Sequence, residues 1–91
     1  MNLSCKPKRS PEIAWRSVED EAVLVDPKNG TVYPLNPVAA FCWRRCDGRL
    51  SAAEIIDEAF GEFEADERQI EKDLADFIEQ LLEKGLVKID A

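Results

Sequence analysis

TVYPLNPVAAFCWRRCDG, residues 31–48, is the stretch that decides the fold, because a strand ends and a helix begins inside it. Residues 31–35 include β-branched and aromatic side chains of the kind that favour a strand. Asn36 is a good helix N-cap, and Pro37 suits the first helical position because an N–H there would have no partner anyway. We therefore predict a strand over residues 31–35 and a helix from Pro37 to about Cys46.

Two further strands are predicted upstream, over Ile13–Val18 (IAWRSV) and Glu21–Asp26 (EAVLVD). Both are short runs with β-branched or aromatic residues, and Glu19-Asp20 separates them. Residues 26–30, Asp-Pro-Lys-Asn-Gly, connect to the third strand through a strong turn signal, since proline presets φ and Asn-Gly supplies positive φ. The N-terminal third is therefore predicted to be a three-stranded antiparallel sheet.

Two more helices are predicted downstream. Ser51-Ala-Ala-Glu54 is a capping box that opens a short helix, which we expect to end at Gly61. Asp66 caps a longer helix that ends at Gly85 and is followed by a short extended tail. Its apolar residues recur at i, i+4, i+7 and i+8: Ile70, Leu74, Phe77, Ile78, Leu81 and Leu82. The fold class is thus α+β, an N-terminal three-stranded antiparallel sheet followed by three helices, in a winged-helix-like arrangement with the wing placed first.

The chain of 91 residues has the length of one domain. Residues 1–11, rich in lysine, arginine and proline, are predicted to be a flexible basic N-terminal arm, and residues 12–91 a single folded domain. No apolar run approaches the roughly 20 residues needed to cross a bilayer, and the N-terminus lacks the apolar stretch of a signal peptide. We expect a cytoplasmic protein, without membrane contact, whose three cysteines are reduced thiols.

Charge argues against nucleic acid as a partner. Residues 1–50 carry eight Lys/Arg against six Asp/Glu, whereas residues 51–91 carry four against thirteen. The acidic half would be repelled by phosphate backbones, on which non-specific nucleic-acid affinity depends. A winged-helix DNA-binding protein fits the order of elements, but it needs a basic recognition helix, and residues 67–84 carry three basic against six acidic side chains.

The side chains that usually carry catalysis are scarce. The chain has no histidine, and its four glycines occur singly, so no glycine-rich phosphate loop exists. We interpret the carboxylates as a solvated helix face rather than an acid–base pair. Cys42 and Cys46 share one helix face, and Cys5 lies on the arm. We interpret these cysteines as thiols that fill space between packed elements, rather than as a metal site or a redox pair. We expect no enzyme, cofactor or metal.

Phe41 and Trp43 lie two positions apart, so they point in different directions on a helix. We expect both to be packing anchors, one toward the core and the other toward the underside of the sheet or the second helix. Arg44, Arg45 and Arg49 form the one basic cluster of the folded part. Pairing of these arginines with the acidic third helix is preferred over a phosphate-binding role.

The ordered set of motifs over residues 12–89 resembles the PqqD family, the small peptide-binding proteins of pyrroloquinoline quinone (PQQ) synthesis and their relatives. The family pattern is a strand ending in tyrosine-x-leucine-asparagine, a helix with tryptophan shortly before aspartate-glycine, a short helix, and a long final helix. The matching segments are Tyr33-Pro-Leu-Asn36, Ala40-Phe-Cys-Trp43, Cys46-Asp-Gly48, the helix start Ser51-Ala-Ala-Glu-Ile-Ile56, and the final helix with its end, Phe77–Val87.

The resemblance implies a RiPP recognition element, which captures the leader segment of a ribosomally made precursor peptide and presents it to a modifying enzyme, in many systems a radical S-adenosylmethionine enzyme. The leader is expected to add as a strand to the third strand of the sheet and to lie against the third helix. An exposed strand edge offers unpaired backbone groups for such an addition. The implied site comprises the edge Thr31, Val32, Tyr33, Pro34 and Leu35, the groove wall Leu74, Phe77 and Leu81, and the rim Asp73 and Gln80.

Several alternatives remain open at this stage. Pro34 lacks an N–H, so it either interrupts the peptide ladder, lies where no donor is needed, or guards a free edge from aggregation. The precursor, which belongs either to PQQ synthesis or to another pathway, is not named by the resemblance, although the acidic third helix favours a leader with basic residues. An open edge also allows weak pairing of two copies. A structural adaptor remains an alternative. A carrier protein is disfavoured, because this chain lacks the Asp-Ser-Leu attachment site of that class.

Overall fold

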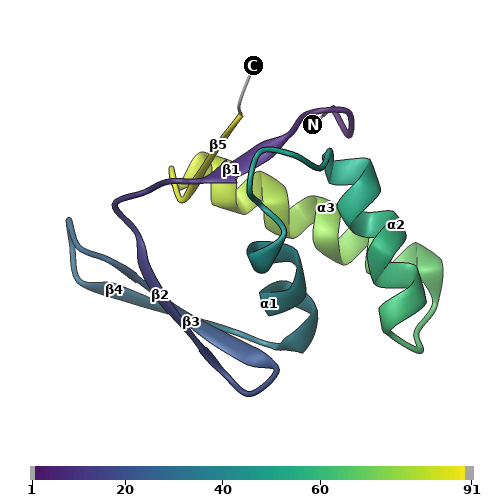
Figure 1. Cartoon of the computed structure of the whole chain (residues 1–91), viewed down its shortest axis with the longest axis horizontal. Coiled ribbons are helices and arrows are strands. Elements are labelled where there is room, and N and C mark those ends of the chain that lie inside the picture. The colour runs from purple at the N-terminus through teal and green to yellow at the C-terminus, as the bar shows by residue number, and fades with distance from the viewer. Residues whose placement is uncertain (1, 90–91) are drawn as a thin grey trace.

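The computed structural model of the chain describes residues 2–89 (Figure 1). Two antiparallel sheets and three helices make up the fold, which confirms the predicted α+β class and the three-stranded sheet followed by three helices. None of the helices in the described residues is long and apolar enough to span a membrane. The elements in chain order are β1 (Pro7–Arg9), β2 (Ala14–Val18), β3 (Glu21–Asp26), β4 (Thr31–Leu35), α1 (Pro37–Arg44), α2 (Ala52–Glu62), α3 (Glu67–Glu83) and β5 (Val87–Ile89).

The larger sheet has the strand order β2-β3-β4, so β3 is central and the other two strands are edges. The turn between β3 and β4 forms as its sequence predicts: Gly30 has φ +70 and donates its N–H to the Asp26 carbonyl oxygen at 2.8 Å. The register places Leu24 of β3 between Trp15 and Tyr33. All three side chains therefore lie on the face of the sheet that covers the helices.

The helix starts agree with their predicted caps. The Asn36 side chain accepts the Ala39 N–H at 2.8 Å, and both hydrogen bonds of the capping box between Ser51 and Glu54 are present. That cap lowers the pKa of Glu54, because the backbone N–H and side chain of Ser51 favour the ionised carboxylate.

Two predicted helix ends are wrong by one or two residues. Gly61 lies inside α2, which ends at Glu62, because glycine is tolerated there in a helical conformation. Helix α1 ends at Arg44 rather than near Cys46, because its last turn tightens: Cys46 donates its N–H to the Trp43 carbonyl, three residues back, at 3.1 Å.

Helix α1 lies between the three-stranded sheet and the other two helices (Figure 1). Phe41 and Trp43 are both buried, on opposite sides of this central helix. The Trp43 ring packs edge-on against Trp15 of β2, with ring centroids 6.2 Å apart. Phe41 packs in the same manner against Phe63 after α2, at 5.4 Å. The two aromatic side chains therefore join α1 to both of its neighbouring layers, as packing anchors.

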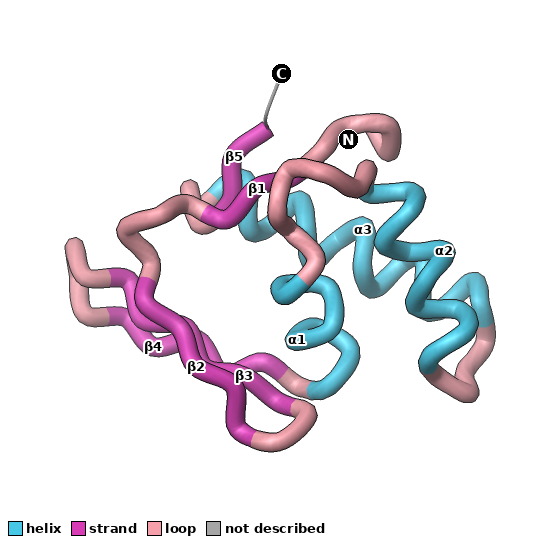
Figure 2. Tube along the Cα trace, in the orientation of Figure 1, coloured by secondary structure: helices cyan, strands magenta, loops and turns pink. Residues whose placement is uncertain are grey.

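The prediction of a flexible arm over residues 1–11 is wrong for the part that the structure describes, residues 2–11. Strand β1 pairs antiparallel with β5, with Lys8 opposite Lys88 (Figure 2). Pro7 and Ser10 are buried, and the Ser10 hydroxyl donates to the Gly85 carbonyl at 2.7 Å. Met1 of the predicted arm and residues 90–91 of the predicted domain lie outside the described residues.

The cause of this correction is a set of hydrogen bonds to distant parts of the chain. The Arg9 guanidinium donates to the carbonyls of Trp43 and Arg44 at 3.0 and 2.8 Å, at the C-terminal end of α1. Ahead of β1, the Cys5 carbonyl accepts the Ala52 N–H at 2.8 Å, at the start of α2. A short basic segment is thus ordered because free carbonyls and N–H groups at helix ends provide partners for it.

Candidate functional site

Strand β4 is an edge of the larger sheet, and no strand of residues 2–89 pairs with its outer side. Pro34 lies opposite Val23 of β3. A proline within a sheet is accommodated where its missing N–H would point away from the neighbouring strand, so the backbone of Pro34 faces the free edge. Hydrogen-bonded and non-hydrogen-bonded pairs alternate in an antiparallel ladder, so the backbone groups of Val32 face the free edge as well. The edge therefore offers the N–H and C=O of Val32 and the C=O of Pro34.

Beside α3, the surface is hollowed in two places that share Phe77. The first hollow, of about 50 Å³, is largely apolar and lies between β4 and the C-terminal half of α3. Its lining comprises Leu24, Tyr33, Leu35, Phe77, Gln80, Leu81, Lys84 and Leu86. The second hollow, of about 220 Å³, lies toward the start of α1 and is lined by Asn36, Val38, Ala39, Asp73, Leu74 and Phe77. We refer to the two hollows together as the β4–α3 groove.

The structure brings together seven of the ten side chains that the sequence assigned to a site. Tyr33, Leu35, Phe77, Gln80 and Leu81 line the first hollow, and Asp73, Leu74 and Phe77 line the second. Thr31, Val32 and Pro34 line neither hollow: they are exposed, and Val32 retains 56% of its accessible surface. The contribution of Val32 and Pro34 to a site is therefore through their free backbone groups, whereas the backbone groups of Thr31 face β3.

Sequence reasoning missed several residues of the groove. Val38 and Ala39 belong to the first turn of α1, which directly continues β4, so the chain order carried a signal for them. Lys84 and Leu86 directly follow α3, where the chain turns back toward the sheet. Each end of the groove is therefore lined by chain that adjoins the predicted strand or the predicted helix.

The two hollows differ in the charge at their rims. Lys84 lines the first hollow and Asp73 the second, and each is the single charged side chain of its lining. The Asp73 carboxylate accepts a hydrogen bond from the Gln69 amide, one turn earlier on α3, at 2.8 Å. The groove thus has a cation near one end and an anion near the other.

The predicted pairing with the acidic third helix is wrong for Arg44 and Arg45, which bind other partners. Arg44 donates to the Ser17 hydroxyl at 3.1 Å and to the Glu21 carbonyl at 2.9 Å, which ties α1 to the β2–β3 hairpin. Arg45 pairs with Glu58 of α2 at 2.9 Å. Both side chains therefore connect the helices and the sheet.

The thiols of Cys42 and Cys46 are fully buried. A side-chain hydrogen bond with Cys46 and burial away from water raise the pKa of Cys42 well above its ordinary value, so its thiolate is disfavoured. The Cys46 thiol itself donates to the Cys42 carbonyl at 3.2 Å. Within residues 2–89, no three His, Cys, Asp or Glu side chains are grouped closely enough to hold a metal ion.

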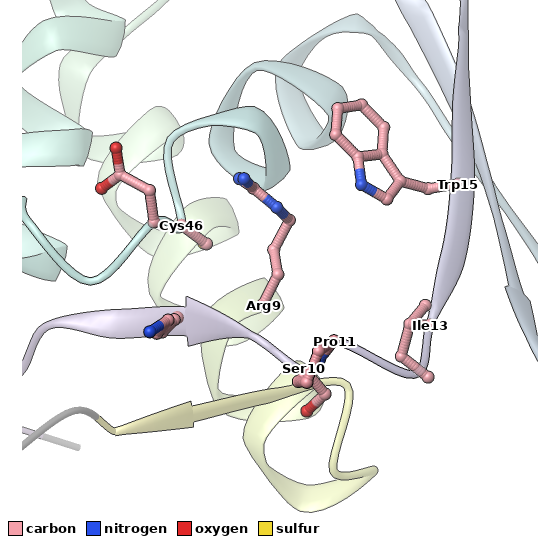
Figure 3. Close-up of a pocket in the computed structure, with 8 residues that line it drawn as sticks. Arg9, Ser10, Pro11, Ile13, Trp15 and Cys46 are labelled. Carbon is pink, nitrogen blue, oxygen red and sulfur yellow. The ribbon is translucent and has the colours of Figure 1, made fainter.

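A third hollow, of about 250 Å³, lies between β1, β2 and the end of α1 (Figure 3). Arg9 reaches across it toward Trp15, with the guanidinium carbon 5.4 Å from the ring centroid. This guanidinium already donates to two α1 carbonyls, so the polar group that faces the hollow is used in a structural contact. The β4–α3 groove is therefore the better candidate for a binding site.

Comparison with known proteins gives a consistent result at the level of sequence. Residues 21–87 match the family model of coenzyme PQQ synthesis protein D (PqqD). A protein described as "PqqA binding protein" from Xanthomonas euvesicatoria pv. vesicatoria (strain 85-10) is 36% identical over 70 residues, which cover 77% of this chain and 74% of that protein. A protein of the same description from Xanthomonas axonopodis pv. citri (strain 306) matches to the same extent.

Two solved structures share the fold. TbiB1 in complex with the TbiA(beta) leader peptide superposes with a TM-score of 0.77 and is 30% identical, over 92% of this chain and 98% of that chain. Lasso peptide synthetase B1 complexed with the leader peptide superposes with a TM-score of 0.75 and is 26% identical, over 91% and 98% of the two chains. The resemblance drawn from the sequence motifs is confirmed: the chain belongs to the PqqD family.

Proposed function

We propose that this chain captures the leader segment of a ribosomally made precursor peptide and presents it to a modifying enzyme. The observation that carries the proposal is the free edge of β4 beside the apolar β4–α3 groove. The descriptions of the relatives support it, since two are PqqA binding proteins and two structures contain a leader peptide.

The leader binds by strand addition. The free backbone groups of Val32 and Pro34 bond to the peptide backbone and give affinity that depends little on peptide sequence. Alternate peptide side chains point into the groove, where Tyr33, Phe77 and Leu81 provide apolar contacts. Selectivity then comes from the shape of the two hollows and from the charges of Lys84 and Asp73 at their rims.

The role is that of a non-catalytic partner. The chain has no histidine to act as a general base, and the pKa of Cys42 is raised, which opposes nucleophilic chemistry there. The chemistry belongs to the modifying enzyme, which we infer to be a radical S-adenosylmethionine enzyme of PQQ synthesis or of a related pathway. The site of action is the cytoplasm.

The test is an amide NMR titration of the labelled domain with the leader of a precursor encoded beside it. Shifts should saturate and concentrate in residues 31–35 and 73–82. Phe77→Ala should weaken binding about 30-fold, because truncation of a central aromatic anchor costs about 2 kcal/mol. Phe60→Ala is the matched control: this residue is also partly buried, but it lies on α2 outside the groove, so leader affinity should not change.

The proposal fails if leader peptides leave residues 31–35 and 73–82 unmoved. Shifts caused by a DNA duplex instead would establish the winged-helix DNA-binding alternative. Shifts caused by a partner protein alone would establish a structural adaptor.

A further inference from the structure

The outer face of the three-stranded sheet, which points away from the helices, is unusually apolar. Leu24 is fully buried on the inner face, so its neighbours Val23 and Val25 point outward. The register places Val25 between Ala14 and Val32, and Val23 between Arg16 and Pro34. The outer face comprises six apolar residues, Ala14, Val18, Val23, Val25, Val32 and Pro34, and the charged pair Arg16 and Glu21.

This composition is unusual for an antiparallel sheet that has one face exposed to solvent. An antiparallel sheet with one solvated face alternates apolar and polar residues, whereas a strand covered on both faces is apolar throughout. The interior of β3, Ala22 to Val25, reads as a covered strand. Val18 and Val32 keep 49% and 56% of their accessible surface. A hollow of about 390 Å³ at one end of the sheet is lined by Val18, Val23 and Pro34 of the outer face together with Ala22 and Leu35 of the inner face.

We propose that this outer face is the docking surface for the modifying enzyme, and that the enzyme prefers the leader-loaded domain. The inference rests on the proposed function. Val32 and Pro34 belong both to the outer face and to the edge at which the leader adds. A leader strand on β4 extends the face by one strand, so a protein seated there contacts the domain and the outward side chains of the peptide together.

Size favours the enzyme over a second copy of the chain. Three strands about 4.8 Å apart, with about five residues of 3.3 Å each, give a face of roughly 240 Å². A stable interface needs about 800 Å² on each partner. The face alone is too small for a stable homodimer, but it suffices as one part of a larger surface that also includes the bound peptide. The enzyme surface should be apolar, with an acid opposite Arg16 and a base opposite Glu21.

The test measures binding of the modifying enzyme encoded beside this chain to the domain, with and without saturating leader peptide. The enzyme should bind the loaded domain about tenfold more tightly or better, a normal size for such coupling. Val23→Lys should weaken enzyme binding about tenfold or more and leave leader affinity unchanged. Should the lysine disturb folding, the double variant Val23→Thr, Val25→Thr keeps the β-branched shape and should show a smaller loss.

Ile89→Lys is the control, because Ile89 keeps 45% of its surface exposed on the other sheet, so the same charge is added elsewhere. It should change neither affinity. If the leader binds but Val23→Lys binds the enzyme like the wild type, the docking surface is wrong and the proposed function stands. If sedimentation shows a dimer that Val23→Lys dissociates, a second copy covers the face. If the wild-type domain binds no leader, both proposals fall.

Discussion

The two sheets of this small domain are built in opposite ways. The three-stranded sheet is made of consecutive strands joined by short turns, and both of its edges are free within the described residues. The two-stranded sheet joins β1 to β5, from the two ends of the chain (Figure 1). Its strand β1 is also held on its other side, where Arg9 donates its N–H to the Cys46 carbonyl at 2.8 Å and Gly48 to that of Pro7 at 3.0 Å.

The two sheets therefore have different roles: the two-stranded sheet stabilises the fold, and the three-stranded sheet is open for binding. The two-stranded sheet closes β1 on both sides and ties the chain ends to α1 and α2, so its contacts serve the folded state. The three-stranded sheet leaves the edge of β4 open beside the groove, which is what strand addition requires. Changes in the first sheet should therefore affect unfolding, and changes in the second should affect peptide binding.

The largest stability effect is expected from Arg9→Ala. This change removes the two guanidinium hydrogen bonds to the Trp43 and Arg44 carbonyls and the contact with Trp15. Hydrogen bonds to a charged group contribute about 1.5–3 kcal/mol each, and partial exposure reduces that, so a loss of about 2 kcal/mol is expected. Thermal unfolding should show a midpoint lower by about 10 °C, while leader affinity of the folded domain stays the same.

Lys8→Ala is the matched control for Arg9→Ala. Lys8 lies next to Arg9 on β1, but it is exposed and faces Lys88 across the ladder, so its removal should leave stability unchanged or slightly higher. Equal losses for both variants would show that the strand pairing, rather than the Arg9 contacts, holds the segment. A loss of leader affinity in Arg9→Ala would contradict the separation of the two sheets.

The same contrast explains how much of the fold the sequence predicted. The three-stranded sheet and the helix starts depend on local signals, such as the Asn29-Gly30 turn and the caps at Asn36 and Ser51, and these predictions are confirmed. The pairing of β1 with β5 has no local signal. Three residues of each strand meet across almost the whole chain, and the burial of Ser10 depends on a carbonyl at Gly85. Composition alone made this segment look like a mobile arm.

The candidate site was predictable to a similar degree. Leu74, Phe77 and Leu81 repeat at helical spacing, so periodicity placed them on the apolar face of the helix. The PqqD resemblance then assigned them to a groove wall. Lys84 and Val38 were not predicted, because each lines the groove only when the chain after α3 and the first turn of α1 fold against it. Tertiary packing decides which side chains lie at the two ends of the groove, and the conformational preference of single residues does not.

Pro34→Ala tests the role of the three-stranded sheet in leader binding. Alanine restores an N–H at the free edge of β4, opposite the incoming leader, without removing a bond to β3. One added hydrogen bond is worth about 1 kcal/mol, so leader affinity should rise about fivefold, as measured by calorimetry. Self-association should increase as well, because proline protects free edges.

Two outcomes would contradict that argument. Unchanged leader affinity in Pro34→Ala would mean that the peptide makes no backbone bond at this position. A large loss of stability would mean that Pro34 is held within the sheet by contacts other than the ladder. The control is Pro11→Ala, a proline outside both sheets, which should leave leader affinity unchanged.

The smallest effect is expected from Lys88→Glu. Lys8 and Lys88 lie directly opposite each other on the two-stranded sheet, an arrangement that destabilises a ladder. Exchange of one lysine for glutamate turns this repulsion into an attraction and should stabilise the domain by about 0.5 kcal/mol. The midpoint of thermal unfolding should rise by about 3 °C, and the gain should shrink at high salt, since screening weakens exposed pairs. Leader affinity should stay unchanged, because this sheet lies outside the β4–α3 groove. A gain in stability that persists in 1 M salt would assign the effect to packing rather than charge, and a change in leader affinity would show that the two sheets are coupled.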